Sequence, residues 1–393
     1  MRIKSLNLIN FRNYTNQHID FDEKLNILYG DNAQGKTNIL EAIYFCARGR
    51  SFKNIKESDI IKFGENQSGL IADIKIGNLD KKVAIQIFED KKKEISVNQI
   101  PIDALKELKT IFDVVIFSPE DLKVVKESPQ YRREFLDELI FSMVPQYKIE
   151  KNNYDKILME RNKLLKMNNN KYFKESIEVL NKQLSKSCAY ISYIRNNFLR
   201  ILNLYSKINH RNLSRGNEDL ELKFQTNVYK EYIERKLSSL TDENIKDKRY
   251  EIIEKIEKDY LDLLDKSLER DIEYKNTLYG IHKDDFDILV NGLLCKKYGS
   301  QGQQRTAMLS LKLAEINVFN IVKGSRPILL LDDVFSELDE KRQNYLISSI
   351  KKSQTIMTTN SLEALENKNI SGNTYLIKNG EVVDVHRYRW KSN

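Results

Sequence analysis

The fold is decided by the stretch Gly30-Asp31-Asn32-Ala33-Gln34-Gly35-Lys36-Thr37, which fits the pattern Gly-x-x-x-x-Gly-Lys-[Ser/Thr]. An apolar run, Leu25–Tyr29, precedes it. Apolar residues at helical spacing follow it, at Ile39, Leu40, Ile43 and Ala47. A strand, a glycine-containing loop and a helix in this order are the context in which the pattern predicts a phosphate-binding loop. The alternative is an ordinary glycine turn that carries Lys-Thr by coincidence.

Each residue type in this loop has a chemical task. Gly30 and Gly35 allow the backbone to curl, so that its N–H groups and the positive end of the following helix converge on phosphate oxygens. Lys36 would neutralise the β- and γ-phosphates, and the Thr37 hydroxyl would bind Mg²⁺ together with the phosphates. The loop therefore predicts nucleotide binding, with Mg²⁺ as the accompanying metal.

Length and composition limit the classes of protein that remain. The 393 residues leave room for two or three domains. The formal charge of +8 favours polyanionic partners, although 31% charged residues of both signs also suit a water-exposed surface. No apolar stretch approaches the roughly 20 residues that a membrane span needs, and Met1-Arg2-Ile3-Lys4 is typical of a strand and not of a signal peptide. We therefore expect a cytoplasmic protein that acts without a membrane.

Cysteine and histidine show no metal-binding or disulfide pattern. The three cysteines and the four histidines are scattered along the chain, and no C-x-x-C spacing occurs. These residues are Cys46, Cys188, Cys295, His18, His210, His282 and His386. We expect buried thiols and no metal other than nucleotide-borne Mg²⁺.

The chain is organised as two α/β segments separated by a helical one. Residues 1–117 show short strands around a helix, residues 118–272 are mainly helical, and residues 273–393 return to an α/β pattern. Within the middle segment, a strand is predicted around residues 220–224 and a second helical stretch over residues 228–269. In the last segment, the turn Asn291-Gly292 between two apolar runs predicts a hairpin.

A second candidate site is a pair of carboxylates, Asp332 and Asp333, directly after the apolar run Ile328–Leu331. Open α/β sheets place their ligands at the carboxyl ends of strands, where this pair lies. Asp332 would hold Mg²⁺ through water, and Asp333 would orient or deprotonate an attacking water molecule. The alternative is a strand that ends in a solvated turn.

A third candidate is the helix start Ser300-Gln301-Gly302-Gln303-Gln304-Arg305. Free N–H groups at the beginning of a helix and its positive dipole favour an anion. On its own the motif fits a capped helix equally well.

Six motifs together resemble those of a known family. They are Phe11-Arg12-Asn13-Tyr14, residues 32–37, Gly49-Arg50-Ser51-Phe52, residues 117–122, residues 300–305 and Asp332-Asp333-Val334-Phe335-Ser336-Glu337-Leu338-Asp339. In this order they resemble the ABC-type ATPase heads of the SMC and Rad50 group and, more closely, the RecF family of bacterial recombination mediators. The resemblance covers nearly the whole chain and implies an α/β fold, an ABC-type P-loop ATPase head with an inserted, mainly helical lobe.

The resemblance also implies how the motifs act. In such heads two copies enclose two ATP molecules, so that Ser300 of one copy meets the γ-phosphate held by Lys36 of the other. The loop of residues 336–339 crosses the same interface, and residues 118–121 link the nucleotide to the lobe. The implied ATP-binding residues are Arg12, Gly30, Asp31, Asn32, Ala33, Gln34, Gly35, Lys36 and Thr37. The implied dimer-interface residues are Ser300, Gln301, Gly302, Gln303, Ser336 and Asp339, the catalytic residues are Lys36, Asp332, Asp333 and Ser300, and the Mg²⁺ ligands are Thr37 and Asp332.

Two departures from related patterns are visible. RecF chains usually read Gly-Pro-His-Arg-Asp-Asp where this chain reads Gly280-Ile281-His282-Lys283-Asp284-Asp285, so we attach no mechanism to His282, Asp284 or Asp285. The switch histidine of transporter ATPases is missing near residues 358–360, and the base is Asp333 in place of glutamate. Both changes indicate slow hydrolysis, and the resemblance implies that DNA stimulates it.

The implied function is an ATP-driven homodimer on DNA, at single-stranded and double-strand/single-strand junctions, that supports repair, replication restart and the SOS response with RecR, RecO and RecA. Two other classes stay open, a DNA-processing SMC-like head and the ATP-binding subunit of a transporter. Candidate DNA contacts, each of which also fits a solvated lysine face, are Lys91, Lys92, Lys93, Lys123, Lys126, Arg211, Arg215, Lys296 and Lys297.

Overall fold

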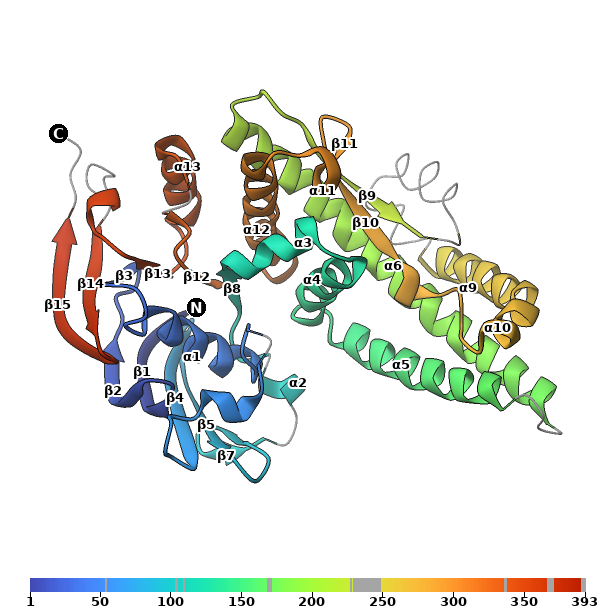
Figure 1. Ribbon diagram of the computed structural model, residues 1–393, viewed down its shortest axis with the longest axis horizontal. Coiled ribbons are helices and arrows are strands. Elements are labelled where there is room, and N and C mark those ends of the chain that lie inside the picture. Colours follow the sequence, from blue (N-terminus) through green and yellow to red (C-terminus); the bar gives the residue numbers. More distant parts are fainter. Residues whose placement is uncertain are drawn as a thin grey trace. The chain divides into compact units, whose positions relative to one another are not determined.

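The computed structural model describes residues 1–53, 55–102, 105–108, 110–167, 172–226, 228, 249–335, 338–365 and 371–389 (Figure 1). Its contacts divide the chain into two compact units. We call them the head unit (Met1–Leu122, Asn212–Gly216 and Met308–Asn393) and the helical unit (Lys123–Arg211 and Asn217–Ala307). Both chain ends belong to the head unit.

A six-stranded sheet forms the centre of the head unit. Its strands β14, β3, β13, β12 and β8 run parallel, and β15 pairs with β14 in the antiparallel sense. In sheet order the strands are β15 (Glu381–Arg389), β14 (Ser371–Lys378), β3 (Leu25–Tyr29), β13 (Thr355–Thr359), β12 (Ile328–Leu331) and β8 (Val114–Phe117). Strands β8, β12 and β13 are buried along their whole length, which is why they read as continuous apolar or threonine-containing runs.

A second sheet of the head unit is antiparallel throughout. Its strands in order are β2 (Tyr14–Asp20), β1 (Arg2–Phe11), β4 (Gln67–Ile76), β5 (Leu79–Phe88), β6 (Glu94–Val97) and β7 (Ile100–Pro101). Residues of β4 and β5 alternate between buried and exposed, because one face of each strand packs on the core. Both strands agree with the short strands that the sequence predicts within residues 1–117.

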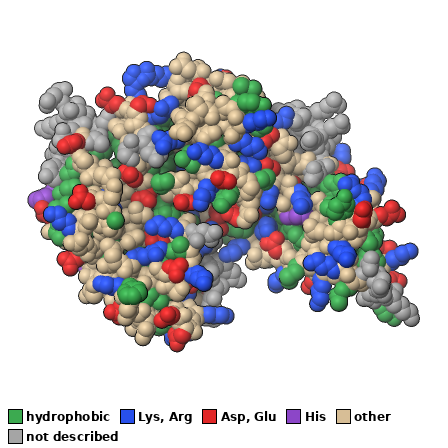
Figure 2. Space-filling view, in the orientation of Figure 1, with side chains coloured by type: hydrophobic (Ala, Val, Ile, Leu, Met, Phe, Trp, Pro, Cys, Tyr) green, Lys and Arg blue, Asp and Glu red, His purple; other side chains and the backbone are tan. Residues whose placement is uncertain are grey.

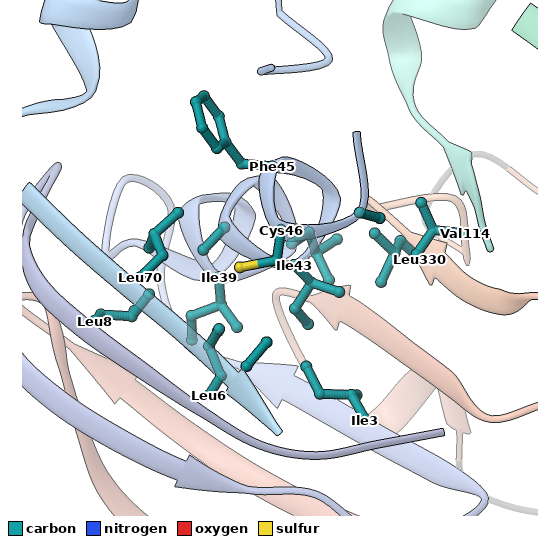
Figure 3. Packing of buried hydrophobic residues seen from close by; sticks show 14 of the residues in the cluster. Ile3, Leu6, Leu8, Ile39, Ile43, Phe45, Cys46, Leu70, Val114 and Leu330 are labelled. Carbon is teal, nitrogen blue, oxygen red and sulfur yellow. The ribbon is translucent and has the colours of Figure 1, made fainter. Parts of the chain in front are cut away.

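Helix α1 (Lys36–Arg48) supplies the core that both sheets share. Figure 3 shows Ile39 and Ile43 of this helix among side chains of both sheets. The neighbours labelled there are Ile3, Leu6, Leu8, Leu70, Val114 and Leu330. The apolar spacing that follows the glycine loop in the sequence is therefore the buried face of α1.

Apart from helix α12 (Gln301–Lys323), the remaining elements of the head unit are helix α13 (Glu340–Ile350) and several short helical segments. The short segments are α2 (Leu105–Leu108) and the 3₁₀ turns η1 (Glu57–Ile60), η2 (Pro119–Asp121) and η6 (Glu363–Leu365). Helix α12 starts in the helical unit and continues into the head unit. No helix within the described residues combines the length and the apolar character needed to cross a bilayer.

The helical unit consists mainly of helices. They are α3 (Leu122–Lys126), α4 (Pro129–Phe141), α5 (Pro145–Lys166), α6 (Phe173–Ser214), α9 (Arg249–Lys266), α10 (Leu268–Tyr274) and α11 (Cys295–Tyr298), of which α5, α6 and α9 are the longest. A three-stranded sheet accompanies them, in the order β11 (Leu293–Leu294), β10 (Asp285–Val290) and β9 (Leu220–Gln225), next to the turn η4 (Ile281–Lys283). The predicted strand around 220–224 is confirmed, whereas residues 229–248 of the predicted helical stretch lie outside the described residues.

Two sequence expectations differ from the structure. The second arm of the predicted hairpin pairs only over Leu293–Leu294, because residues 295–298 turn into the short helix α11. Residues 273–307, which the sequence had assigned to the ATPase head, group with the helical unit. The physical reason is that β10 pairs along its length with β9, while Asp285 accepts two hydrogen bonds from Arg132 at 2.7 and 3.0 Å.

A buried network of ion pairs and hydrogen bonds holds the segment from Gly280 to Asp285 in place. The Arg195 guanidinium, 1% exposed, donates to Asp137 at 2.9 Å, lies 3.3 Å from Asp284 and donates to the Ile281 carbonyl at 2.8 Å. Burial raises the pKa of Asp284 to about 7, although Arg195 acts in the opposite direction. His282 contacts the Tyr154 hydroxyl at 2.5 Å, and burial lowers its pKa to about 4. These contacts hold β10 and η4 against the long helices.

We predict that Arg195→Ala lowers the free energy of unfolding by roughly 3–5 kcal/mol, because Asp137 and Asp284 would stay buried without their cation. The matched control is Arg211→Ala, which removes an exposed pair with Asp219 and should change stability little. Urea denaturation followed by far-ultraviolet circular dichroism measures both. Equal effects of the two substitutions would contradict this assignment.

Candidate functional site

The glycine loop has a backbone that only glycine fits at two places. Gly30 has φ +143° and Gly35 has φ +114°. A Cβ at Gly30 would lie 2.4 Å from the carbonyl oxygen of Ile377, and a Cβ at Gly35 would lie 2.6 Å from the Asn13 side chain. The loop is therefore fixed between β3 and α1 by close packing as well as by backbone conformation.

Neighbouring turns hold this loop from outside. The Asn13 amide donates to the Gln34 carbonyl at 3.0 Å, and the Tyr14 hydroxyl donates to the Gly35 carbonyl at 3.1 Å. From the β14–β15 turn, the backbone N–H of Asn379 donates to Oε1 of Gln34 at 2.7 Å. Asn13 and Tyr14 belong to a motif that the sequence analysis identified, but the contacts of both turns with the loop are visible only in the structure.

Lys36 lies in the middle of the loop and is 8% exposed. Its ammonium donates to the carbonyls of Gly30 and Asp31, the latter at 2.8 Å, and to Oδ1 of Asn360 at 2.9 Å. Burial lowers the pKa of Lys36, while the nearby charges of Asp333, Asp31 and Asp332 oppose that shift. A phosphate bound by the loop could replace these neutral oxygens as partners of the ammonium.

Asp332 joins the loop to the end of the parallel sheet. Its Oδ1 accepts hydrogen bonds from the hydroxyls of Thr37 at 2.7 Å and Thr358 at 2.9 Å. The residue is 8% exposed, and burial raises the pKa of its carboxyl group, an effect that the two hydroxyls partly offset. Thr37 and Asp332 thus present a hydroxyl and a carboxylate at one point, the hard oxygen donors that suit Mg²⁺.

Asp333 follows in a left-handed conformation, with φ +52°. This conformation costs an ordinary residue roughly 1–2 kcal/mol and is less unfavourable for aspartate. The backbone N–H of Asp333 donates to the Thr358 hydroxyl at 2.9 Å. Thr358 therefore contacts both acidic residues. The sequence located a switch position near residues 358–360, but it did not identify the contacts of Thr358 or Asn360.

Arg12 is held by a buried glutamate. Its guanidinium donates to Glu41 at 2.8 and 3.0 Å and to the Asp59 carbonyl at 2.7 Å. Glu41 is fully buried and also accepts from the Ser51 hydroxyl. Within the described part of the chain, the Arg12 side chain makes its hydrogen bonds to these residues and not to the glycine loop, so its contact with ATP stays a prediction.

The helix start at Ser300 is a reciprocal cap. The Gln303 N–H donates to the Ser300 hydroxyl at 3.2 Å, and the Ser300 N–H donates to Oε1 of Gln303 at 2.8 Å. The Gln303 amide also donates to Glu218 at 2.8 Å. Asp339 caps α13 by accepting from the N–H groups of Lys341 and Arg342, both at 3.1 Å. Ser336 lies outside the described residues. The role of these groups at a dimer interface stays a prediction.

The turn at residues 118–121 connects to helix α12 within the head unit. The Ser118 N–H donates to Asp121 at 2.6 Å, and Nζ of Lys312 lies 3.8 Å from the same carboxylate and 2.8 Å from Glu315. Burial raises the pKa of Asp121, and Lys312 opposes that shift. This buried group of charges fixes α12 to the turn that follows β8.

The predicted DNA contacts remain predictions. Several of the cations already have acidic partners, since Lys91 pairs with Glu94, Lys93 with Glu57 and Arg211 with Asp219. Figure 2 shows basic and acidic side chains interspersed on the visible face. Pairing of this kind reduces the attraction for a phosphate backbone at those positions.

Comparison with known proteins agrees with this geometry. A family model described as the RecF/RecN/SMC N terminal domain matches residues 2–381. The chain is 40% identical over 387 residues to the DNA replication and repair protein RecF of Clostridium acetobutylicum, and the match covers 98% of this chain and all of that protein.

Solved structures give the same result. A structure of the recombination mediator protein RecF with ATP in the RecFOR pathway superposes with a TM-score of 0.83 at 33% identity, covering 98% of this chain and 97% of the other. An SMC head bound to the C-terminal winged-helix domain of ScpA superposes with a TM-score of 0.56 at 14% identity, covering 99% of this chain and 98% of the other. The second likeness concerns the fold alone.

We predict that Gly30→Ala weakens ATP binding about tenfold or more, because the new methyl group would push the loop away from the Ile377 carbonyl. Gly64→Ala is the matched control, since Gly64 also has a positive φ of +86° but an added Cβ there would meet no atom within 4 Å. Titration with a fluorescent ATP analogue measures both. A Gly30→Ala protein that binds ATP like the Gly64→Ala protein would show that this packing does not shape the site.

Proposed function

This chain belongs to the RecF family, within the RecF/RecN/SMC group of ATPase heads, and on that premise we propose that it is an ATP-operated DNA replication and repair protein. ATP binding would close two copies of the chain on DNA, and hydrolysis would release them. The family membership leaves the transporter-subunit alternative without support. The same membership favours a RecF-type role over that of a separate DNA-processing enzyme.

The observation that carries the proposal is the 2.7 Å hydrogen bond between Thr37 and Asp332. It joins the glycine loop to the acidic strand across 295 residues of sequence. ATP hydrolysis in P-loop proteins needs these two elements side by side, because one holds the phosphates and the other carries the carboxylates for metal and water. The buried ammonium of Lys36 completes the arrangement.

The residues divide the reaction between them. Lys36 and the loop N–H groups would bind the β- and γ-phosphates. The Lys36 ammonium would then exchange its hydrogen bonds to Asn360 and the backbone carbonyls for hydrogen bonds to phosphate oxygens. Thr37 and Asp332 would hold Mg²⁺, which when bound neutralises phosphate charge. Asp333 would accept the proton of a water molecule whose oxygen attacks the γ-phosphorus, giving ADP and inorganic phosphate. Asp333 is two residues beyond the end of β12 and has a different backbone conformation from Asp332, which suits this separate role.

We further propose the partners and location of the protein. Single-stranded DNA and double-strand/single-strand junctions would be the substrate, and RecR, RecO and RecA would act with the chain, because RecF relatives are described within the RecFOR pathway. The residues Ser300–Gln303 of one copy would face the ATP held by the other, with Asp339 and Ser336 at the same interface. A protein that acts on the bacterial chromosome would work in the cytoplasm, and DNA would stimulate a weak hydrolysis.

We predict that multi-angle light scattering shows single chains with ADP and paired chains with ATP and gapped DNA. Ser300→Arg should bind ATP as a monomer but fail to pair, because the larger cation would occupy the place of the second copy's phosphate. Ser348→Arg, the same change at an exposed position of α13, should pair normally. The wild-type chain remaining single with a non-hydrolysable ATP analogue and DNA would overturn the proposal.

We predict that Asp333→Asn reduces ATP turnover about 100-fold or more, because the amide cannot accept the proton of the attacking water. Asparagine tolerates the left-handed backbone of this position, so ATP binding should persist and the paired form should accumulate. Lys36→Ala is the comparison, since it should lose both binding and turnover. Phosphate release and ATP binding are measured on the same preparations. Normal turnover in Asp333→Asn would refute the assigned base.

A further inference from the structure

Three adjoining depressions lie at the amino ends of the parallel strands of the head unit. The first is a cavity of about 210 Å³ with apolar walls, formed by Leu25, Phe335, Ile347, Ile350 and Met357. The second, of about 440 Å³, is lined by the cations Arg2, Lys24, Lys75, Lys351 and Lys352. Lys24, Lys351 and Ser353 line both, and Lys24 also lines the third, so the depressions form one continuous surface.

This surface lies away from the nucleotide site. Leu25 begins β3, and the glycine loop follows the other end of that strand, roughly 17 Å away at the usual rise per residue. The floor is tightly held: the Thr355 N–H donates to the Lys24 carbonyl at 2.6 Å, and the Gln354 amide donates to the carbonyls of Ile3 and Asp22, both at 2.8 Å. A ligand here would not compete with ATP.

The charge of the surface is strongly positive. Glu23 is the acidic residue that lines the second depression, and it forms an ion pair with Arg2. The ammonium groups of Lys24, Lys75, Lys351 and Lys352 have no acidic partner among the described residues. Asp22 lines the third depression, where its carboxylate accepts from the Lys24 N–H at 2.9 Å. The basic rim therefore favours carboxylates or phosphates beside an apolar cavity.

The buried hydroxyl of Ser353 is a second observation, besides the charge of the surface, that points to a ligand. Ser353 is 7% exposed, and its hydroxyl makes no hydrogen bond within the part of the chain that the structure describes. A buried hydroxyl without a partner costs stability, so such groups usually find a partner in the protein, in water or in a ligand. Ser353 lies where the apolar and basic depressions meet, and a carboxylate at this point could accept a hydrogen bond from its hydroxyl.

We propose that this surface binds an acidic peptide segment of a partner protein that also carries a large apolar side chain. The apolar side chain fills the cavity under α13, and neighbouring carboxylates contact the lysines and the Ser353 hydroxyl. Nucleic acid would satisfy the lysines but leave the apolar cavity empty. An uncharged apolar segment would leave the lysines and Ser353 without partners. The combination of both features selects the acidic peptide.

The test is fluorescence anisotropy of a fluorescein-labelled peptide, Gly-Ser-Asp-Glu-Asp-Asp-Leu-Phe, with the full chain. Saturable binding is expected, and it should weaken as salt rises. A peptide with Lys in place of the acidic residues and one with Ser-Ser in place of Leu-Phe should both bind at least about tenfold more weakly. The proposal would be overturned if the Ser-Ser peptide bound as tightly as the Leu-Phe peptide, or if duplex DNA displaced the labelled peptide and unlabelled peptide did not. Either result would show a surface that binds polyanions in general.

Variants locate the binding on this surface. Lys351→Glu with Lys352→Glu should weaken peptide binding at least about tenfold, whereas the matched pair Lys163→Glu with Lys166→Glu, at exposed positions of α5, should not. Ser353→Ala should weaken binding about threefold without lowering the melting temperature, because the lost hydroxyl has no partner in the protein itself. Unchanged peptide binding in the Lys351/Lys352 variant, a lower melting temperature for Ser353→Ala, or no saturable binding by the wild-type chain would each refute the proposal. ATP binding should stay normal in all variants, which separates this result from the proposed ATPase function.

Discussion

The structure of the head unit depends on one buried carboxylate, that of Asp332, and on the two hydroxyls that satisfy it. A carboxylate at the end of an apolar strand is unfavourable unless it is hydrogen-bonded, and burial raises its pKa accordingly. Thr37 and Thr358 supply the hydrogen bonds from the start of α1 and from the neighbouring strand β13. Three elements that are far apart in sequence therefore meet at one oxygen atom. Because the same oxygen donors suit a divalent cation, the contact that stabilises the fold also prepares the site for its chemistry.

The parallel sheet separates two kinds of surface. At the carboxyl ends of its strands lie the glycine loop, the acidic pair and Asn360, all of which are polar and densely hydrogen-bonded. At the amino ends lie the apolar cavity and the basic rim. Phe335 connects the two, since it follows the acidic pair in the chain, is buried, and forms one wall of the cavity. A rearrangement of the loop after Asp333 would therefore also alter the shape of the cavity.

Local patterns in the sequence predicted what local physics determines. The glycine loop, the buried strands and the amphipathic face of α1 follow from residue spacing, and the structure confirms them. Thr358 was not identified, because a threonine in a strand is common and its role arises only from the register of β13 beside β12. The contacts of the segment around Asp284 could not be predicted either, since its partner Arg195 lies on α6, 89 residues away in the sequence. The short helix α11 stands where the sequence predicted a strand, because a segment as short as Leu293–Tyr298 has no periodicity that separates the two structures.

The predicted contact between Arg12 and ATP depends on the hydrogen bonds that the Arg12 guanidinium already makes. Glu41 and the Asp59 carbonyl accept from three of the five guanidinium N–H groups, so a phosphate bound by the groups that face Glu41 would replace part of these bonds. Glu41 is fully buried and needs compensation if the arginine turns away. Ser51 already donates to that carboxylate, and Nζ of Lys53 lies 3.7 Å from it. Glu41 would thus keep two partners, one of them a cation, and the transfer of Arg12 to a phosphate would not leave a buried charge unpaired.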